Sequence, residues 1–305
     1  MKKVIQETPR IKRFLLSPEE GFRLPAFSAG SHITTYVSGR ECHYSLVSSP
    51  EDRKVYELAV LLEEGSKGGS LYWHHHIHEG DQVDISDPKN HFPLSDRAKH
   101  HIFFAAGIGI TPFMAMMAQL RANSGSFELH YAARSKDQCA FYEDIVRQYP
   151  GESQFYFSKD NCRMTPEILE KQPIGTHVYF CGPEAMINQF SNAAKSNGYP
   201  EGSIHFERFA PKKPTDPKSF EVELKKSGRI LNVPEDETLL DVILRAGIRA
   251  PYSCRVGECG TCELQVLKGE IDHYDSCLTE GEKREQNVML ACVSRALSSK
   301  LVLNV

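Results

Sequence analysis

The stretch that decides the fold of the C-terminal part reads Pro251-Tyr252-Ser253-Cys254-Arg255-Val256-Gly257-Glu258-Cys259-Gly260-Thr261-Cys262. Its three cysteines follow the pattern C-x4-C-x2-C, and a fourth, Cys292, lies further on in the chain. This spacing is typical of a plant-type [2Fe–2S] cluster, which is held by four thiolates. Glycines at 257 and 260 allow the tight backbone that such a loop needs, and they let amide groups point at the sulfides. The sequence therefore predicts a cluster bound by Cys254, Cys259, Cys262 and Cys292.

A four-cysteine zinc site is the alternative, because zinc also accepts four thiolates in a tetrahedral arrangement. Structural zinc sites usually combine two close cysteine pairs, and no second C-x2-C pair surrounds Cys292. The cluster is therefore the favoured interpretation. We interpret Glu258 and Glu263 as solvated surface charges and not as ligands.

Composition places the chain among ordinary globular proteins. It has 305 residues, of which 40% are hydrophobic and 25% charged, so two or three domains are expected. No apolar run is long enough for a membrane span or a signal peptide, which predicts a cytoplasmic protein without a membrane partner. The net charge of −4 gives no reason to expect nucleic acid as a partner. In a reducing compartment the nine cysteines should not form disulfides.

The chain divides at changes of pattern. The stretch Pro211-Lys212-Lys213-Pro214-Thr215-Asp216-Pro217-Lys218 cannot form a helix or a central strand, so we interpret 211–218 as a linker. Short β-rich runs before residue 97 predict a small antiparallel barrel over 1–96. Strands then alternate with helices over 97–210, which predicts a parallel sheet wound with helices. A strand hairpin and a helix closed by Gly247 are expected at the start of 219–305.

Two turns of the α/β region suit a dinucleotide. The first, Gly107-Ile108-Gly109-Ile110-Thr111-Pro112, follows an apolar strand. Gly107 and Gly109 let a nucleotide approach the backbone, Thr111 is a good N-cap, and Pro112 is a good first helical residue. A glycine pair of this kind also occurs in turns that serve only packing.

The second turn is Cys181-Gly182-Pro183, again between a strand and a helix. It places Cys181 at the carboxyl end of the sheet, where open α/β sheets bind ligands. A small buried residue is the alternative role of this cysteine. Arg134, which follows the strand expected from Phe127 to Ala132, offers a cation to the nucleotide.

A flavin is expected because a nicotinamide gives up two electrons as hydride, whereas the cluster accepts one at a time. His43, Tyr44 and Ser45 offer an aromatic face beside a hydroxyl group. Gly68, Gly69 and Ser70 precede a helical segment, so Ser70 is a plausible N-cap, and Lys67 could assist a phosphate there. A tight turn and a core tyrosine are the alternatives. The histidine-rich run 74–78 is interpreted as a solvated face and not as a metal site.

Taken together, these motifs resemble the phthalate dioxygenase reductase family along the whole chain. The resemblance rests on the order of Tyr44-Ser45-Leu46, Gly68-Gly69-Ser70, Asn90-His91-Phe92-Pro93-Leu94, Gly107-Ile108-Gly109-Ile110-Thr111-Pro112, Cys181-Gly182-Pro183 and the cysteine set. It implies an FMN-binding barrel, an NAD(P)H-binding α/β domain and a C-terminal β-grasp ferredoxin domain. It also implies that Phe209 lies near the flavin ring.

The chain departs from this family at one position. The family pattern is Arg-x-Tyr-Ser, and Cys42 stands where the arginine is expected, with Arg40 two residues earlier. On a strand, that earlier position lies on the same face but about 7 Å away. Loss of a guanidinium near the flavin phosphate should cost roughly 1.5–3 kcal/mol of binding unless Lys67 or Arg40 compensates.

The resemblance implies an enzyme that takes hydride from NAD(P)H to FMN and passes single electrons through a [2Fe–2S] cluster to a terminal oxygenase, preferably of the Rieske type. NADH is the expected donor, although Arg134-Ser135-Lys136 could hold the 2′-phosphate of NADPH. Two alternatives remain at this point. One is a reductase of a cytochrome P450. The other is a non-enzymatic iron–sulfur carrier or redox sensor with a vestigial flavin site.

Overall fold

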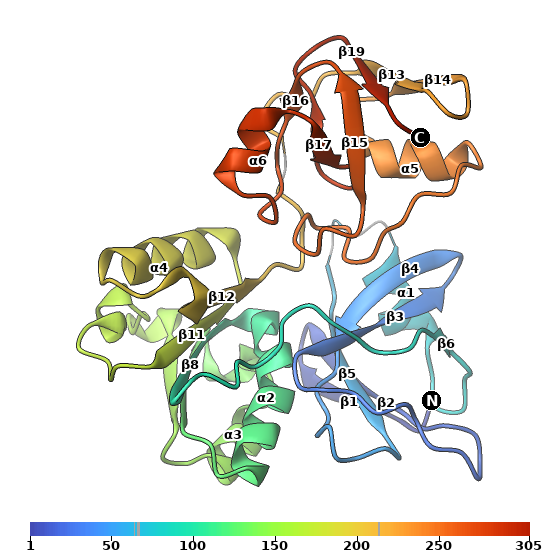
Figure 1. The fold of residues 1–305 in the computed structure, drawn as a ribbon. Coiled ribbons are helices and arrows are strands. Elements are labelled where there is room, and N and C mark those ends of the chain that lie inside the picture. Colours follow the sequence, from blue (N-terminus) through green and yellow to red (C-terminus); the bar gives the residue numbers. More distant parts are fainter. Residues whose placement is uncertain (64, 66–67, 213) are drawn as a thin grey trace. The chain divides into compact units, whose positions relative to one another are not determined.

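The computed structural model describes residues 1–63, 65, 68–212 and 214–305. It divides into two compact units, Met1–Glu207 and Arg208–Val305 (Figure 1). The predicted linker lies just after this division, at the start of the second unit. We describe each unit by itself.

The first part of unit 1 is an antiparallel barrel made of two sheets. One sheet has the order β1-β2-β5, and in the other β3 pairs with β4, β6 and β7. The strands are β1 (Lys3–Thr8), β2 (Ile11–Leu16), β3 (Ser31–Val37), β4 (Arg40–Ser45), β5 (Tyr56–Leu61), β6 (Asp84–Ile85) and β7 (Lys89–Asn90). The apolar run β5 and the alternating run β2 bury one shared core, in which Phe14 meets Trp73 of helix α1 (Gly69–His76) edge to face at 4.7 Å.

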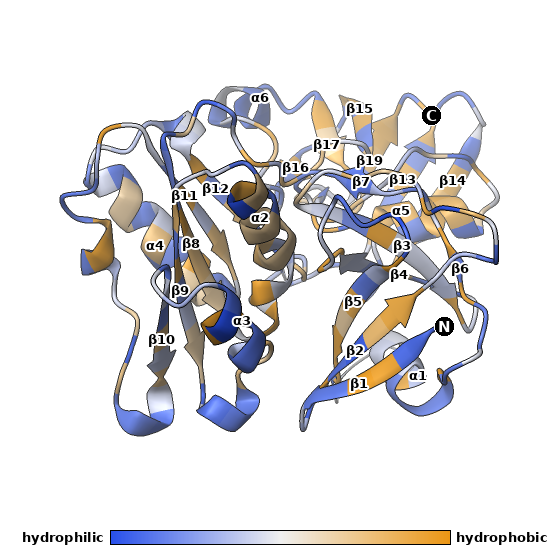
Figure 2. Ribbon diagram, turned by 90° about the horizontal axis from the view of Figure 1, so that it is seen from below, coloured by the Kyte–Doolittle hydropathy of each residue, from blue (hydrophilic) through white to orange (hydrophobic). Residues whose placement is uncertain are grey.

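The second part of unit 1 is a five-stranded sheet in which every neighbouring pair is parallel. Its order is β10-β9-β8-β11-β12. The strands are β8 (His100–Ala106), β9 (Phe127–Ala133), β10 (Ser153–Phe157), β11 (Thr176–Cys181) and β12 (Ile204–Glu207). In Figure 2, β8 and β9 are coloured mainly as hydrophobic, whereas the loops at the lower ends of β9 and β10 are mainly hydrophilic.

Helices cover both faces of this sheet. Phe103 and Tyr179 face one core, which helices α2 (Thr111–Ala122) and α3 (Tyr142–Gln148) close. Phe104 and Phe180 face the other core, beneath α4 (Glu184–Ser196). The apolar strands are therefore buried on both sides, as expected for a doubly wound sheet. Short 3₁₀ turns complete the connections: η1 (Gly107–Ile110), η2 (Lys136–Gln138), η3 (Ser158–Asp160), η4 (Pro166–Leu169) and η5 (Glu201–Ser203).

Unit 2 is a mixed sheet of order β14-β13-β19-β15-β17, with helix α5 (Leu239–Arg245) packed on it. Its strands are β13 (Phe220–Leu224), β14 (Arg229–Val233), β15 (Glu263–Lys268), β17 (Val288–Leu290) and β19 (Lys300–Leu303). A small ribbon of β16 (Ile271–Asp272) and β18 (Arg295–Ala296) and helix α6 (Glu280–Glu285) stand beside it. The predicted hairpin is present as β13 and β14, and Gly247 follows α5 with a left-handed φ of 75°.

Candidate functional site

The carboxyl ends of β8 and β11 form the first candidate site. These strands are parallel neighbours in the middle of the sheet, and the strand order reverses direction beside β8. Open α/β sheets bind ligands at such a reversal. The turns that follow the strands touch each other: a Cβ on Gly109 would lie 2.1 Å from the Cys181 carbonyl oxygen. The structure therefore brings the two predicted nucleotide turns together.

A cavity of about 670 Å³ opens beside these turns. Among its lining residues are Gly107, Pro183 and Arg134, which the sequence predicted, and Arg163, which it did not. Thr111, Pro112 and Cys181 are buried and, like Gly109 and Gly182, are absent from the lining. Two arginines beside an apolar wall suit a ligand that carries phosphates and a planar ring.

The end of the first turn differs from the expected geometry. Helix α2 starts at Thr111 itself, and its N-cap is Ile110, which offers no side-chain cap. The Thr111 hydroxyl donates instead to the Ile108 carbonyl at 3.0 Å, because the 3₁₀ turn η1 already supplies the helix entry. The prediction of Thr111 as N-cap and Pro112 as first helical residue was wrong by one position.

The second candidate site joins strand β4 to the start of helix α1. Cys42 and Tyr44 point toward the barrel core, where the Tyr44 ring meets Trp73 edge to face at 5.6 Å. The Tyr44 hydroxyl also bonds the Cys42 thiol, and burial raises the pKa of both groups. A Cβ on Gly69 would lie 2.5 Å from the Cys42 sulfur. The two predicted flavin motifs are therefore adjacent.

The same helix start carries a cation from β4. A Cβ on Gly68 would lie 3.3 Å from Nε of Arg40. Gly68 is the N-cap, with a left-handed φ of 111°, and it has no side chain with which to cap the first amides of α1. Helical amides that lack a side-chain cap and lie next to a guanidinium suit a phosphate group.

The remaining predicted flavin residues have varied surroundings. Ser70 is not the N-cap: it lies inside α1, and its hydroxyl accepts from the Glu63 amide at 3.2 Å. Ser45 is buried, and His43 bonds Thr34 through Nδ1 at 3.0 Å. Phe209 belongs to the second unit, with 46% of its side chain exposed. Lys67 lies outside the described residues.

The third candidate site holds the four cysteines in two contacting pairs. A thiol hydrogen bond joins Cys254 to Cys259, and another joins Cys262 to Cys292. The thiol hydrogen bond within each pair lowers the pKa of Cys259 and of Cys262, because the neighbouring S–H stabilises the thiolate. The pairs are themselves neighbours, since Cys292 interacts electrostatically with Cys254. Two pairs of thiolates match two iron ions that share bridging sulfides. This donor set fits a [2Fe–2S] cluster.

The loop that carries these cysteines is held from several directions. Arg255, with a φ of 58°, forms an ion pair with Asp241 of α5 at 2.7 Å. Gly257 has a φ of 80°, and a Cβ there would lie 2.7 Å from a Val293 methyl group. Glu258 does not fit the prediction of a solvated charge. Its side chain is only 15% exposed and pairs with Arg208 at 3.0 Å, while burial raises its pKa.

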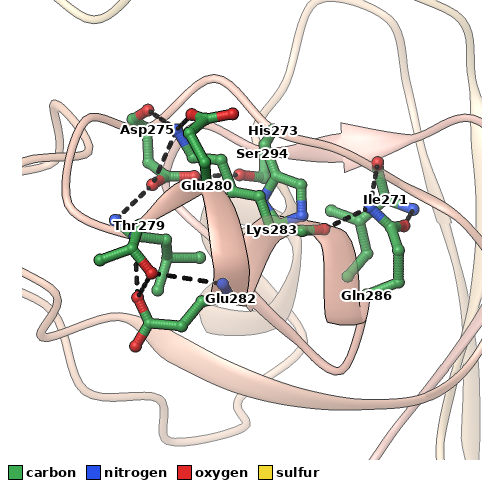
Figure 3. A network of polar contacts seen from close by, with 10 residues as sticks. Ile271, His273, Asp275, Thr279, Glu280, Glu282, Lys283, Gln286 and Ser294 are labelled. Carbon is green, nitrogen blue, oxygen red and sulfur yellow. Dashed lines mark hydrogen bonds and ion pairs between the residues drawn. The ribbon is translucent and has the colours of Figure 1, made fainter.

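A polar network around Asp275 supports the same loop (Figure 3). The Asp275 carboxylate is fully buried and accepts from the Leu278 amide at 2.9 Å, with His273 3.4 Å away. Lys283 of α6 donates to the Asp275 carbonyl at 3.1 Å. The next residue, Ser276, donates its amide to the Gly257 carbonyl at 3.0 Å. The network therefore ties helix α6 to the cysteine loop.

Comparison with known proteins finds one matching family model in each of the two units. Residues 222–297 match the family model of the 2Fe-2S iron-sulfur cluster binding domain. Residues 87–204 match the model of the dimethylamine monooxygenase subunit DmmA-like N-terminal domain. The carnitine monooxygenase reductase subunit of Acinetobacter pittii is 40% identical over 301 residues, which cover 98% of this chain and 99% of the relative.

The solved structure of phthalate dioxygenase reductase superimposes with a TM-score of 0.81 at 33% identity, covering 99% of this chain and 96% of that one. The chain belongs to the phthalate dioxygenase reductase-like family. It is accordingly an oxidoreductase that uses NAD(P)H, FMN and a [2Fe–2S] cluster, as its sequence predicted. The family also confirms the predicted fold of flavin barrel, nucleotide-binding α/β domain and C-terminal ferredoxin domain.

A second solved structure shares this fold as part of a larger protein. An intact type IV self-sufficient cytochrome P450 monooxygenase matches 100% of this chain and 40% of its own, with a TM-score of 0.78 and 36% identity. Within the described residues, no helix is both long and apolar enough to cross a membrane.

Proposed function

We propose that this phthalate dioxygenase reductase-like chain is the reductase component of a Rieske-type oxygenase system in the cytoplasm. One observation carries the proposal: a single chain combines a cavity that suits a nucleotide, at the carboxyl end of a parallel sheet, with two adjacent pairs of thiols at ferredoxin spacing. The full-length similarity to an oxygenase reductase supports it. None of the nine cysteines is paired in a disulfide, which fits the reducing conditions of a cytoplasm that supplies NADH.

We assign the nucleotide to the cavity beside the two turns. Arg134 and Arg163 would bind its phosphates, and the glycine turn at Gly107 would let the ring approach the backbone. Lys136, the other candidate for a 2′-phosphate, is already paired with Glu143 at 3.0 Å. We therefore expect NADH to be the preferred donor. The ratio of kcat/KM for NADH and NADPH, measured with ferricyanide as acceptor, tests this preference.

We assign FMN to β4 and the start of α1. Gly68 and Gly69 leave the helix amides accessible to its phosphate, and Arg40 supplies the cation. His43, Tyr44, Ser45 and Ser70 lie on the adjoining elements. When bound, the flavin accepts a hydride and releases single electrons, which a cluster can take up one at a time. The protein contributes binding and orientation, and no side chain needs to act as a general acid or base.

We assign the cluster to Cys254, Cys259, Cys262 and Cys292. The proposed exit for electrons is this cluster, and the proposed acceptor is the Rieske centre of an oxygenase. Reconstitution tests the whole assignment: with NADH, the purified chain should reduce an oxygenase purified from the same source. Reduction of cytochrome c but of no oxygenase would contradict the partner and leave the reductase chemistry intact.

A cytochrome P450 is the second candidate acceptor, because the whole chain matches the reductase part of a self-sufficient P450 monooxygenase. The two partners can be separated in one assay. A P450 partner gives NADH-dependent haem reduction, trapped under carbon monoxide, whereas a Rieske partner shows bleaching of its own iron–sulfur bands.

A further inference from the structure

Arg208 joins the beginning of unit 2 to the cysteine loop. It is the first residue of that unit, and its guanidinium Nη1 donates to Oε1 of Glu258 at 3.0 Å. Its backbone amide donates to Oε2 of the same carboxylate at 3.3 Å. Glu258 directly precedes Cys259 in the loop. One carboxylate therefore receives both the side chain and the backbone of Arg208.

This ion pair is shielded from water, whereas the pair of Lys300 and Glu221 in the same unit is exposed. The side chains of Arg208 and Glu258 are 8% and 15% exposed, whereas those of Lys300 and Glu221 are 39% and 47% exposed. Water screens the exposed pair strongly, so it has little influence beyond its own contact. The buried pair lies in a medium of lower effective dielectric constant, so its charges interact more strongly with other charges at a given distance.

Arg208 also contacts Ser276, which is itself hydrogen-bonded to the cysteine loop. The same Nη1 donates to the Ser276 hydroxyl at 3.2 Å, while the Ser276 amide donates to the Gly257 carbonyl at 3.0 Å. Arg208 thus binds the side chain of Glu258 directly, and it is linked through Ser276 to the backbone carbonyl of the preceding Gly257. Movement of Glu258 would move Cys259 with it.

We propose that Arg208 and Glu258 form a positioning pair for the iron–sulfur centre: their ion pair fixes the cysteine loop, and their balanced charges set its reduction potential. The inference rests on the proposed cluster site. A cluster gains one negative charge when it is reduced. An unbalanced carboxylate next to Cys259 disfavours that gain, and an unbalanced guanidinium favours it.

The test is a redox titration of the cluster in the full-length protein, followed by electron paramagnetic resonance at one pH and ionic strength. Glu258→Gln keeps the size of the side chain and an oxygen that can accept from Arg208, so it isolates the charge. We expect it to raise the midpoint potential. Arg208→Met should lower the potential, and Arg208→Lys should stay closer to the wild type. Glu221→Gln, which removes the same charge from the exposed pair, should leave the potential unchanged.

Shifts of opposite sign in Glu258→Gln and Arg208→Met support the inference. Shifts of the same sign would indicate mere loosening of the loop and overturn it, as would the absence of a shift in both. If Arg208→Met assembles no cluster, Arg208→Lys decides: a restored cluster supports the pair, and continued loss overturns it. A wild-type protein without a cluster would instead contradict the proposed function.

Discussion

The Cys42 sulfur lies so close to Gly69 that a Cβ on this glycine would approach it to 2.5 Å. A thiol thus fills the space at the start of α1 where the family pattern has an arginine. The guanidinium at this helix end comes instead from Arg40, beside Gly68. This arrangement changes what we expect from the departure at position 42, because a cation is still present at the helix start.

Arg40→Ala should weaken FMN binding by roughly tenfold or more, since a charge-assisted contact is worth about 1.5–3 kcal/mol. Fluorescence titration of the flavin-free protein measures the dissociation constant. The double variant Arg40→Ala with Cys42→Arg should recover much of the lost affinity. Arg23 is an exposed arginine of the barrel, so Arg23→Ala serves as the control. Equal affinity in Arg40→Ala and the wild type would refute the role of Arg40.

Gly109→Ala should damage the nucleotide site by packing. Its Cβ would lie 2.1 Å from the Cys181 carbonyl oxygen, and neither backbone can move away cheaply. We expect a loss of stability of roughly 1–3 kcal/mol and a raised KM for NADH. Gly151→Ala is the matched control, because nothing lies within 4 Å of a Cβ there. Similar melting temperatures for the two variants would show that the turns do not pack as described.

A cysteine that only lies near the cluster loop can be distinguished from the four that we assign as cluster ligands. Cys277 is exposed and lies beside the loop, with its sulfur 3.1 Å from a Cβ on Gly260, yet it belongs to neither thiol pair. We expect Cys277→Ser to keep the iron and sulfide content of the wild type and Cys292→Ser to lose it. Iron and acid-labile sulfide analysis gives the result, and a depleted Cys277→Ser protein would speak against the four assigned ligands.

Stability should fall in mild acid because two histidines, the buried His32 and the half-buried His205, are held in neutral form. The pKa of both His32 and His205 is lowered from 6.5 to about 4, and the main cause is desolvation. A depressed histidine pKa means that the unfolded chain binds the proton first. Stability is therefore complete above about pH 6.5 and is lost as the pH falls toward 4, by roughly 1–2 kcal/mol for each histidine at pH 5.

Denaturant titrations between pH 7 and pH 5 measure this slope. The variant His32→Gln should flatten it, whereas His78→Gln, which replaces an exposed histidine, should not. A slope that is the same in all three proteins would argue against the burial of His32 as its cause.

Much of the fold could be predicted because its signals are local. The hairpin predicted at the start of 219–305 is present as β13 and β14, since a hairpin depends on alternating side chains and turn residues that are close together in the sequence. The cysteine spacing likewise predicts a [2Fe–2S] cluster without any knowledge of the fold. The nucleotide turns were recognisable because glycine, threonine and proline stand together between a strand and a helix, although the cap itself falls one residue earlier.

What the sequence could not show depends on contacts between distant residues. Glu258 looked solvated because its partner, Arg208, is 50 residues away in the chain. His74 was expected on a solvated face, but it is buried, and its Nε2 lies 2.8 Å from the Val60 carbonyl oxygen of a neighbouring strand. Arg163 reaches the cavity from a loop that carries no motif. Tertiary packing decides each of these cases.

The central claim is that electrons from NADH reach the cluster within this one chain. Anaerobic addition of NADH to the purified protein, followed by its visible spectrum, tests that claim most directly. We predict that the flavin bands bleach first and that the iron–sulfur bands then bleach, with a cluster signal in electron paramagnetic resonance. Flavin bleaching with a cluster that stays oxidised, or no NADH oxidation at all, would contradict the account.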